Sequence, residues 1–540
     1  MSTTTPSRPR SITDGLGLPP LRDVQPPGII RRAPRALVAG GLLALLLLIS
    51  WYIRTKQING TIWFQEATAI GIATRSFGGV LHASYVGGSA PLYYLLLHFW
   101  VGAVGDGILA VRWLSLIFAF ACIPVAGWAG WSLNGERGAF YASVFFAFSS
   151  MLTQYSAQAQ PYTLLILLGL VASTAFLHGF VYRRRRYLWL FVAAMEAALY
   201  TQGSAGLDLF GVMCAFAVVV WCAPATERRA LLRDGLICGA ALFVLFIPWL
   251  PATIDQIAHA TYPWHYTTLM TTHYLPSDLV GGERVDADLL VIGTLAVGPY
   301  LLSRSRRRDP DGVALYALVV ITFGALACGL IANAAAPTMV ARYYATVASA
   351  LLLFGALAAS RTKIVGFVAT VLMLVMVADP AAFATSHPSN MNEVAAQLGG
   401  RLHQNDIVVS AQPEQAPLAW YYLPTGLRWA TTLGPVRDPR YMDWDDARLR
   451  LERAAPAPTL GRLVASLRPG QQLLFIRPLT EGAQNWKSPW ASLVRLRAAQ
   501  WGQLLSDDVA GGTLTQVASA PVNYPGDCCI ASSAVLYRKP

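Results

Sequence analysis

The run Ala36-Leu-Val-Ala-Gly-Gly-Leu-Leu-Ala-Leu-Leu-Leu-Leu-Ile-Ser-Trp-Tyr-Ile53 decides the fold class of this chain. It holds no charged side chain and is long enough to approach a bilayer span. It lacks a cleavage site of the A-x-A type, so we expect a retained membrane anchor and not a removed signal peptide. Residues 1–35, which precede it, are basic and rich in Pro, Ser and Thr. We expect them to form a disordered cytoplasmic tail.

The composition extends this reading to the whole molecule. Of its 540 residues, 55% are hydrophobic and only 13% are charged, which indicates a polytopic membrane protein. Much of the net charge of +12 sits in short clusters between apolar runs. Such clusters set membrane topology and do not indicate nucleic-acid binding. The sequence has no Walker motif, no GxGxxG loop and no His/Cys cluster, so we expect neither a metal nor another cofactor.

Further apolar runs predict additional spans, and basic clusters orient them. The runs lie at 90–105, 109–132, 138–155, 161–181, 187–202, 204–224, 236–250, 289–303, 313–333, 345–359 and 364–380. The Arg183–Arg186 cluster follows one run and is expected in the cytoplasm. Loop 54–89 is expected outside and the Arg183–Arg186 cluster in the cytoplasm, so an odd number of spans must separate them. The sequence has four candidate runs between them. Either 90–105 or 138–155 does not cross, or one span is missed, so we expect 11 or 13 spans.

The composition changes after residue 381. Asp406-Ile-Val-Val-Ser410 and Gln472-Leu-Leu-Phe-Ile-Arg477 have the pattern of strands, and helical patterns lie between them. We therefore predict a transmembrane domain over 36–380 and an α/β domain over 381–540. Topology places this domain outside the cytoplasm, as a binding module or as a stabilising cap.

The outward loop 54–89 is the first place where chemistry is expected. We expect residues 61–74 to form an amphipathic helix on the membrane surface. Glu66 would then stand where a lipid-borne substrate presents its head group. The alternative is that Glu66 is solvated or pairs with Arg75. His82 lies in the same loop.

Other polar residues lie near the same predicted outer surface. Asp208 is near the outer end of its run and can join a cavity with Glu66, because buried acids usually line polar cavities or pair with another group. His265 lies in an aromatic stretch that suits either sugar recognition or an interfacial aromatic belt. Arg342-Tyr343 begins a span, where an arginine can bind phosphate or anchor the helix at the surface.

The order of these parts resembles the GT-C superfamily of polyprenyl-phosphate-sugar-dependent glycosyltransferases. It is most similar to the bacterial branch related to protein O-mannosyltransferases and the lipid A aminoarabinose transferase. After the first span and its loop come four elements of that order: Pro91-Leu-Tyr-Tyr94, Arg112-Trp-Leu-Ser115, Ser156-Ala-Gln-Ala-Gln-Pro-Tyr162 and Arg342-Tyr343. The high Ala and Arg content resembles that of actinobacterial proteins.

This resemblance implies transfer of a sugar, with mannose expected, from a polyprenyl-phosphate donor to a cell-envelope acceptor. The reaction would take place at the outer face of the plasma membrane and invert the anomeric centre. The chain departs from the family twice, because the Asp-Glu pair of the loop is Gln65-Glu66 and the later Glu and Arg are Gln158 and Gln160. Among the matched positions, Glu66 is then the carboxylate left to act as general base.

The resemblance also implies where the donor binds. We expect its phosphate near Arg342 and Arg75. The remaining candidates for donor or sugar binding are Tyr343, His82, Gln65, Gln158, Tyr162, Asp208 and His265. Two other functions stay open: a transporter or flippase of lipid-linked sugar, and a non-catalytic relative that binds it.

Overall fold

The structure is a computed structural model of the full chain. It describes residues 35–259 except 57 and 88, 309–362 except 337–339, 389–479, 488–520 and 531–540, with isolated positions in 269–279 and 366–375. The predicted tail 1–34, the run 289–303 and His265 lie outside the described residues. The run 364–380 also lies mostly outside them.

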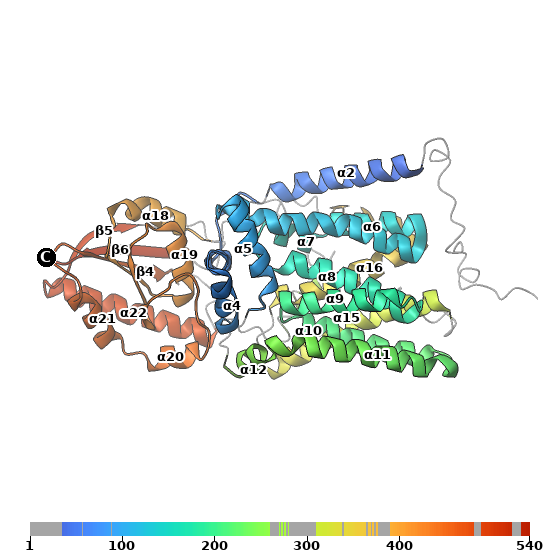
Figure 1. The fold of residues 1–540 in the computed structure, drawn as a ribbon. Coiled ribbons are helices and arrows are strands. Elements are labelled where there is room, and N and C mark those ends of the chain that lie inside the picture. Colours follow the sequence, from blue (N-terminus) through green and yellow to red (C-terminus); the bar gives the residue numbers. More distant parts are fainter. Residues whose placement is uncertain are drawn as a thin grey trace, which may run out of the picture.

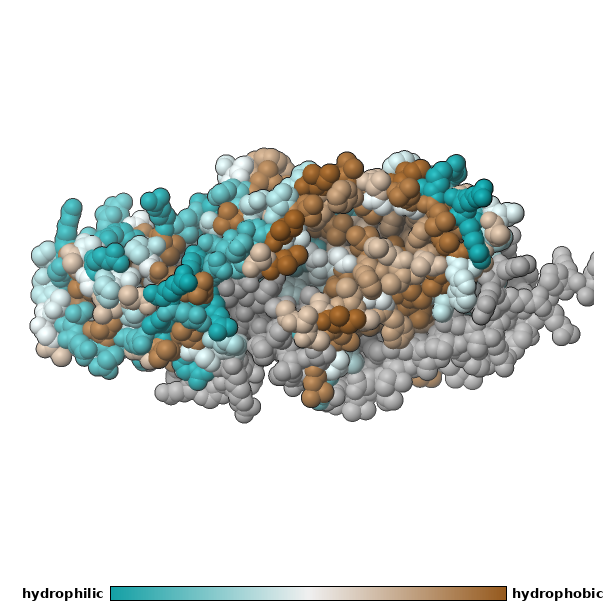
Figure 2. Space-filling view, turned by 90° about the horizontal axis from the view of Figure 1, so that it is seen from below, coloured by the Kyte–Doolittle hydropathy of each residue, from teal (hydrophilic) through white to brown (hydrophobic). Residues whose placement is uncertain are grey.

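A bundle of long apolar helices forms one half of the molecule, on the right of Figure 1. Among the described residues, seven helices are long and apolar enough to cross a membrane. On the face shown in Figure 2, hydrophobic side chains gather over the middle of the bundle, whereas hydrophilic ones gather on the other half. This surface confirms the predicted polytopic membrane protein. The helices of the bundle are α2 (Arg35–Thr55), α6 (Ile108–Ala147), α7 (Ser150–Ser156), α8 (Tyr162–Phe176), α9 (Arg186–Thr201), α10 (Ala205–Cys222), α11 (Ala225–Phe246), α15 (Pro310–Ala335) and α16 (Ala345–Arg361).

Helix α6 is a hairpin of two helical arms. Asn134 and Gly135 leave the helical conformation, and Gly135 has a φ of 64°, which favours glycine. The arms pack backbone to backbone, because a Cβ on Gly130 would stand 2.1 Å from the carbonyl oxygen of Gly138. Residue 138 therefore begins a return arm, as the predicted separate run 138–155 requires.

Helix α5 (Leu92–Val104) is the shorter apolar helix formed by one of the two runs that were expected not to cross. Its 13 residues reach about 20 Å at roughly 1.5 Å each, less than the ~30 Å hydrocarbon core. In Figure 1 it lies across the end of the bundle beside α4 (Phe77–Val86). Without 90–105 the sequence-based count becomes 11, which stays a prediction because two of the remaining runs fall largely outside the described residues.

The second half is a sheet domain with the strand order β3-β2-β1-β4-β6-β5. Strand β1 pairs in parallel with β2 and with β4, and the other pairs are antiparallel. This arrangement confirms the predicted C-terminal α/β domain. The strands are β1 (Ile407–Ser410), β2 (Arg428–Thr431), β3 (Gly434–Val436), β4 (Gln472–Pro478), β5 (Thr515–Ala520) and β6 (Ser532–Arg538). The helices are α18 (Met391–Leu398), α19 (Ala416–Tyr422), α20 (Ala447–Arg453), α21 (Pro456–Ala465) and α22 (Pro489–Ala510).

Helix α3 (Phe64–Ala73) lies between the bundle and the sheet domain. Most of its residues are buried, including Ile70, and they share one hydrophobic core with Leu418 of α19 and Leu474 of β4. The expected amphipathic helix on the membrane surface is therefore wrong. Burial on two sides explains why the second half of α3, Ala69–Ala73, holds only apolar residues, since both the bundle and the sheet domain cover it.

Candidate functional site

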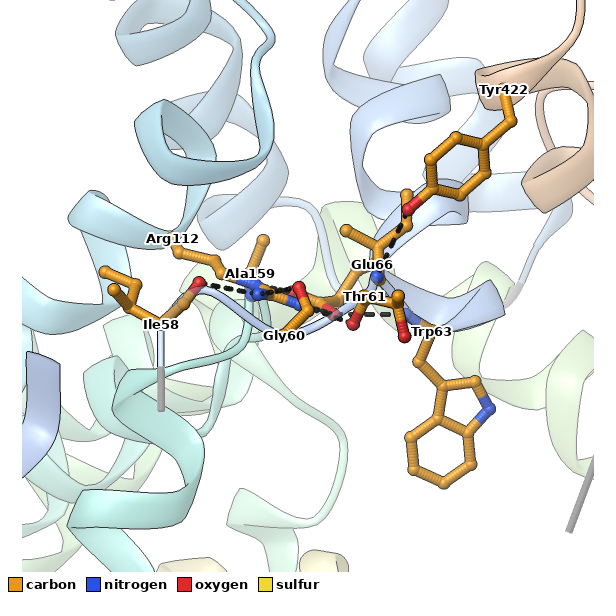
Figure 3. A network of polar contacts seen from close by, with 9 residues as sticks. Ile58, Gly60, Thr61, Trp63, Glu66, Arg112, Ala159 and Tyr422 are labelled. Carbon is orange, nitrogen blue, oxygen red and sulfur yellow. Dashed lines mark hydrogen bonds and ion pairs between the residues drawn. The ribbon is translucent and has the colours of Figure 1, made fainter. Parts of the chain in front are cut away.

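Glu66 lies in the first turn of α3, at the end of the bundle that carries the sheet domain. Its side chain is 1% exposed and forms an ion pair with Arg112 of α6 (Figure 3). Arg112 Nε donates to Oε1 and Nη2 donates to Oε2, both over 2.8 Å. This two-pronged geometry is the strong form of an arginine–carboxylate contact. The partner of Glu66 is thus Arg112, whereas the sequence suggested Arg75.

The remaining donors of Arg112 fix the segment that leads into α3. Nη1 donates to the carbonyl oxygens of Ile58 and Gly60, each at 2.7 Å, and Nη2 donates to Thr61 at 2.9 Å. A guanidinium has five N–H donors, and all five are used here. Arg112 therefore ties residues 58–66 to the bundle.

The carboxylate of Glu66 is equally occupied. Besides the two bonds from Arg112, Oε1 accepts the backbone N–H of Ala159 at 3.0 Å and Oε2 accepts that of Trp63 at 3.1 Å. A carboxylate offers about four acceptor positions. To take a proton from a substrate hydroxyl, Glu66 would have to release one of these donors. Its predicted role as general base stays a prediction.

Two more of the family-like elements join this network. Ala159 belongs to the Ser156–Tyr162 segment, and Ser115 Oγ donates to the carbonyl oxygen of Gln160 at 3.2 Å. Ser115 Oγ also shares a 2.8 Å hydrogen bond with the hydroxyl of Tyr93. Segments spread over roughly a hundred residues of sequence therefore meet around one carboxylate.

Arg342 brings a cationic group to the same place from the start of η4 (Ala341–Tyr344). Its Cζ lies 6.0 Å from the ring centroid of Trp63 and 5.5 Å from that of Tyr343. The hydroxyls of Tyr155 and Tyr162 also interact electrostatically with this guanidinium. Arg342, Tyr343 and Tyr162, all predicted as donor-site residues, thus share one aromatic and cationic cluster next to the Glu66 network.

Three more of the predicted polar residues lie on α10, on α3 and in the Ser156–Tyr162 segment. Asp208 is buried in the first turn of α10 and accepts a hydrogen bond from Thr346, one turn beyond Arg342. Gln65 is partly exposed, unlike its neighbour Glu66. Gln158 is partly buried, and its carbonyl oxygen accepts from the N–H of Gln160 at 2.8 Å. In the described part of the chain, no group of His, Cys, Asp or Glu is arranged to hold a metal ion.

Arg75 lies elsewhere, at the junction with the sheet domain. Its Nη1 is 2.7 Å from Oδ2 of Asp438, and its Cζ is 4.6 Å from the ring centroid of Tyr441. Burial alone would raise the pKa of Asp438, but hydrogen bonds from Arg440 and Arg75 hold that pKa below its usual value. Arg75 therefore binds the sheet domain in this structure.

His82 lines a cavity of about 530 Å³ at the same end of the bundle. The walls come from α4, the start of α5, the end of α9 and the turn after α11, and they are mostly apolar. Tyr85 and Tyr200 both make ring contacts with Trp249 in this wall. The lining residues are Leu81, His82, Tyr85, Pro91, Leu92, Leu95, Tyr200, Pro248 and Trp249.

Two residues of the site carried a signal that the sequence analysis did not use. Arg112 is a charged side chain inside the apolar run 109–132, and such a residue needs a buried partner. Trp63 stands three residues before the acid, and its place beside Arg342 depends on contacts between distant segments. The location of the site in the loop stays a prediction, and the hydrogen bonds that Arg112 makes there were not foreseen from the sequence.

Comparisons with known proteins agree with this architecture. The chain is similar to the crystal structure of ArnT from Cupriavidus metallidurans in the apo state over 93% of this chain and 98% of that one, with a TM-score of 0.50 and 16% identity. The structure of ArnT bound to undecaprenyl phosphate gives 0.49 and 15% over 93% and 97%. An oligosaccharyltransferase from Archaeoglobus fulgidus gives 0.46 and 12% over 80% and 67%. No family model and no curated protein matches the chain. The first of these likenesses shows that the chain has the fold of ArnT.

Proposed function

We propose that this chain is a membrane glycosyltransferase that moves a sugar from a polyprenyl-phosphate donor to an acceptor of the cell envelope. One observation carries the proposal: the Trp63–Glu66 segment, Arg112, the Ser156–Tyr162 segment and Arg342 meet at one end of the bundle. These are the elements whose order resembles the GT-C enzymes, and the shared fold supports the same reading. Mannose is the expected sugar. The site would face the outside of the plasma membrane, with the N-terminus in the cytoplasm.

Arg342 is the residue that would hold the donor phosphate. A guanidinium recognises phosphate through several N–H groups at once. The rings of Trp63 and Tyr343 beside it offer flat faces on which a sugar can stack. A partly water-excluded setting strengthens the attraction between the cation and the phosphate.

The hydrogen bonds that Glu66 accepts bear on which group takes the proton of the acceptor hydroxyl. The acceptor hydroxyl oxygen bonds to the anomeric carbon while the bond from that carbon to the phosphate oxygen breaks. Because Glu66 already accepts four hydrogen bonds, we assign the hydroxyl proton to the departing polyprenyl phosphate. A phosphate monoester has a second pKa of about 6, so it can take this proton. Glu66 then holds the loop, and the general-base role is the competing assignment.

The cavity beside α5 offers a place for a lipid chain. Its apolar walls suit a hydrocarbon chain, and it lies behind the first turn of α5, where Leu92 and Leu95 line it. Tyr93 of the same turn shares a hydrogen bond with Ser115, whose hydroxyl donates to the carbonyl oxygen of Gln160. A lipid chain in this cavity would therefore end close to the network around Glu66.

The test is transfer by the purified chain. It would be incubated with radiolabelled polyprenyl-phospho-mannose and envelope lipids, and the Arg342→Gln variant compared with Arg361→Gln. Arg361 ends the same helical segment at its far end, so it controls for loss of a charge. We expect transfer by the native chain and by Arg361→Gln, and a loss of at least 100-fold in Arg342→Gln. Binding without transfer would support a non-catalytic relative, and uptake into vesicles would support a transporter.

A further inference from the structure

Helix α3 is held at both ends by different parts of the molecule. At its N-terminal end, Glu66 and the preceding loop are tied to α6 through Arg112. At its C-terminal end, α3 meets the sheet-domain segment 438–446. A Cβ on Gly71 would stand 2.0 Å from the carbonyl oxygen of Arg440, so the two backbones touch there. Contact this close leaves little room for the helix to shift against the segment.

Arg75 adds a polar contact beside this backbone approach. It follows the end of α3, pairs with Asp438 at 2.7 Å and lies over the ring of Tyr441 at 4.6 Å. Its side chain is only 11% exposed. Screening by water is therefore weaker than at an exposed ion pair. Arg440 holds the same carboxylate from the other side, with both contacts at 2.9 Å.

The segment 438–446 also reaches the far side of the bundle end. The N–H of Asp446 donates to the carbonyl oxygen of His259, at the end of α12 (Leu250–His259), over 2.8 Å. Tyr422 of α19 is 3.5 Å from the N–H of Ile62, just before α3. The sheet domain thus contacts the chain just before α3 and again at the C-terminal end of α3.

We propose that Arg75 is a positioning residue, whose contact with Asp438 and Tyr441 locks the sheet domain onto α3 and so keeps Trp63 and Glu66 in place beside Arg342. This inference rests on the proposed function for its catalytic consequence. The mechanical part follows from geometry, because α3 has 10 residues and is about 15 Å long. A rigid helix of that length carries a displacement of one end to the other.

The lock is tested first without any substrate. Hydrogen exchange would be measured on the full chain in detergent, at the amides of residues 61–67, for the native protein, Arg75→Gln and Arg440→Gln. Arg440 is the matched control. It contacts the same carboxylate as Arg75, but it belongs to the same segment as Asp438, so this side-chain contact does not join the sheet domain to α3. We expect exchange at least 10-fold faster in Arg75→Gln and unchanged in Arg440→Gln. Equal exchange in Arg75→Gln and the native chain would overturn the lock.

The catalytic consequence is measured separately with radiolabelled polyprenyl-phospho-mannose. A misplacement of about 1 Å can cost 10²-fold in rate, so kcat should fall about 10- to 100-fold in Arg75→Gln while KM for the donor changes less than threefold. Arg75→Lys keeps the charge and should recover part of kcat. A rise in KM with constant kcat would show that Arg75 binds the donor. If the native chain transfers nothing while exchange responds as expected, the lock stands and the proposed function fails.

Discussion

The ion pair between Glu66 and Arg112 can be tested by a double-mutant cycle. Glu66→Gln leaves the guanidinium buried without its charge partner, and it replaces one accepting oxygen by an NH2 group that faces N–H donors. Breaking one side of a buried pair costs about 3–5 kcal/mol. Arg112→Gln should cost a similar amount, since it leaves the carboxylate unpaired and frees the carbonyl groups of residues 58, 60 and 61.

The double variant carries no buried charge at this place. Its loss should therefore be smaller than the sum of the single losses by at least 2 kcal/mol, a coupling within the range of contacting residues. Unfolding would be followed in detergent by tryptophan fluorescence. Glu452→Gln is the control, because its pair with Arg448 is about half exposed and should contribute at most about 0.5 kcal/mol.

If the losses of the single variants add to that of the double variant within about 0.5 kcal/mol, the coupling is refuted.

The same variants, assayed for sugar transfer, separate the two assignments of Glu66. If Glu66 mainly holds the loop, the double variant should regain part of the transfer that Glu66→Gln loses. If Glu66 is the general base, Glu66→Gln should abolish transfer, and the second substitution should restore none of it.

Three further outcomes are expected. Gly71→Ala should destabilise the full chain, because the new Cβ meets the backbone of the sheet domain. The control Gly78→Ala has open space around its Cβ and should be neutral or slightly stabilising. Equal melting temperatures for the two variants would contradict the close approach. Gln65→Asp restores the acid of the resembled enzymes and should raise transfer at least 10-fold, and a fall would show that the amide itself is needed. Burial raises the pKa of Glu414, against hydrogen bonds from Trp490 and Gln412 that lower it. The folded state therefore favours the protonated form, and stability falls as pH rises through the folded pKa. Glu414→Gln should consequently stabilise the chain more at pH 8 than at pH 5 in thermal melts, and the reverse order would refute this sign.

The fold class was readable from the sequence because apolar length and strand alternation are local properties. The run Ala36–Ile53 and the strand Asp406–Ser410 are examples, since their neighbours along the chain suffice to identify them. The surplus run 90–105 was harder. Its residues are as apolar as those of a span, and only its position across the end of the bundle shows why it need not cross.

The candidate site residues were chosen from the sequence for a similar reason. The loop, Glu66 and Arg342 were identified from their order in the chain. Which cation faces Glu66 depends on how α6 packs against the segment before α3, and pairing with Arg75 was only an alternative that the sequence left open. The position of α3 beneath the sheet domain could not be predicted, because an apolar helix covered by protein has the same composition as one covered by lipid.

The account is tested most directly by sugar transfer in the purified protein. The native chain, Arg342→Gln and Arg361→Gln would each be given radiolabelled polyprenyl-phospho-mannose and envelope lipids, and labelled product would be counted against time. The account predicts labelled product from the native chain and Arg361→Gln, and almost none from Arg342→Gln. Equal transfer by all three variants, or transfer by none of them, would contradict it.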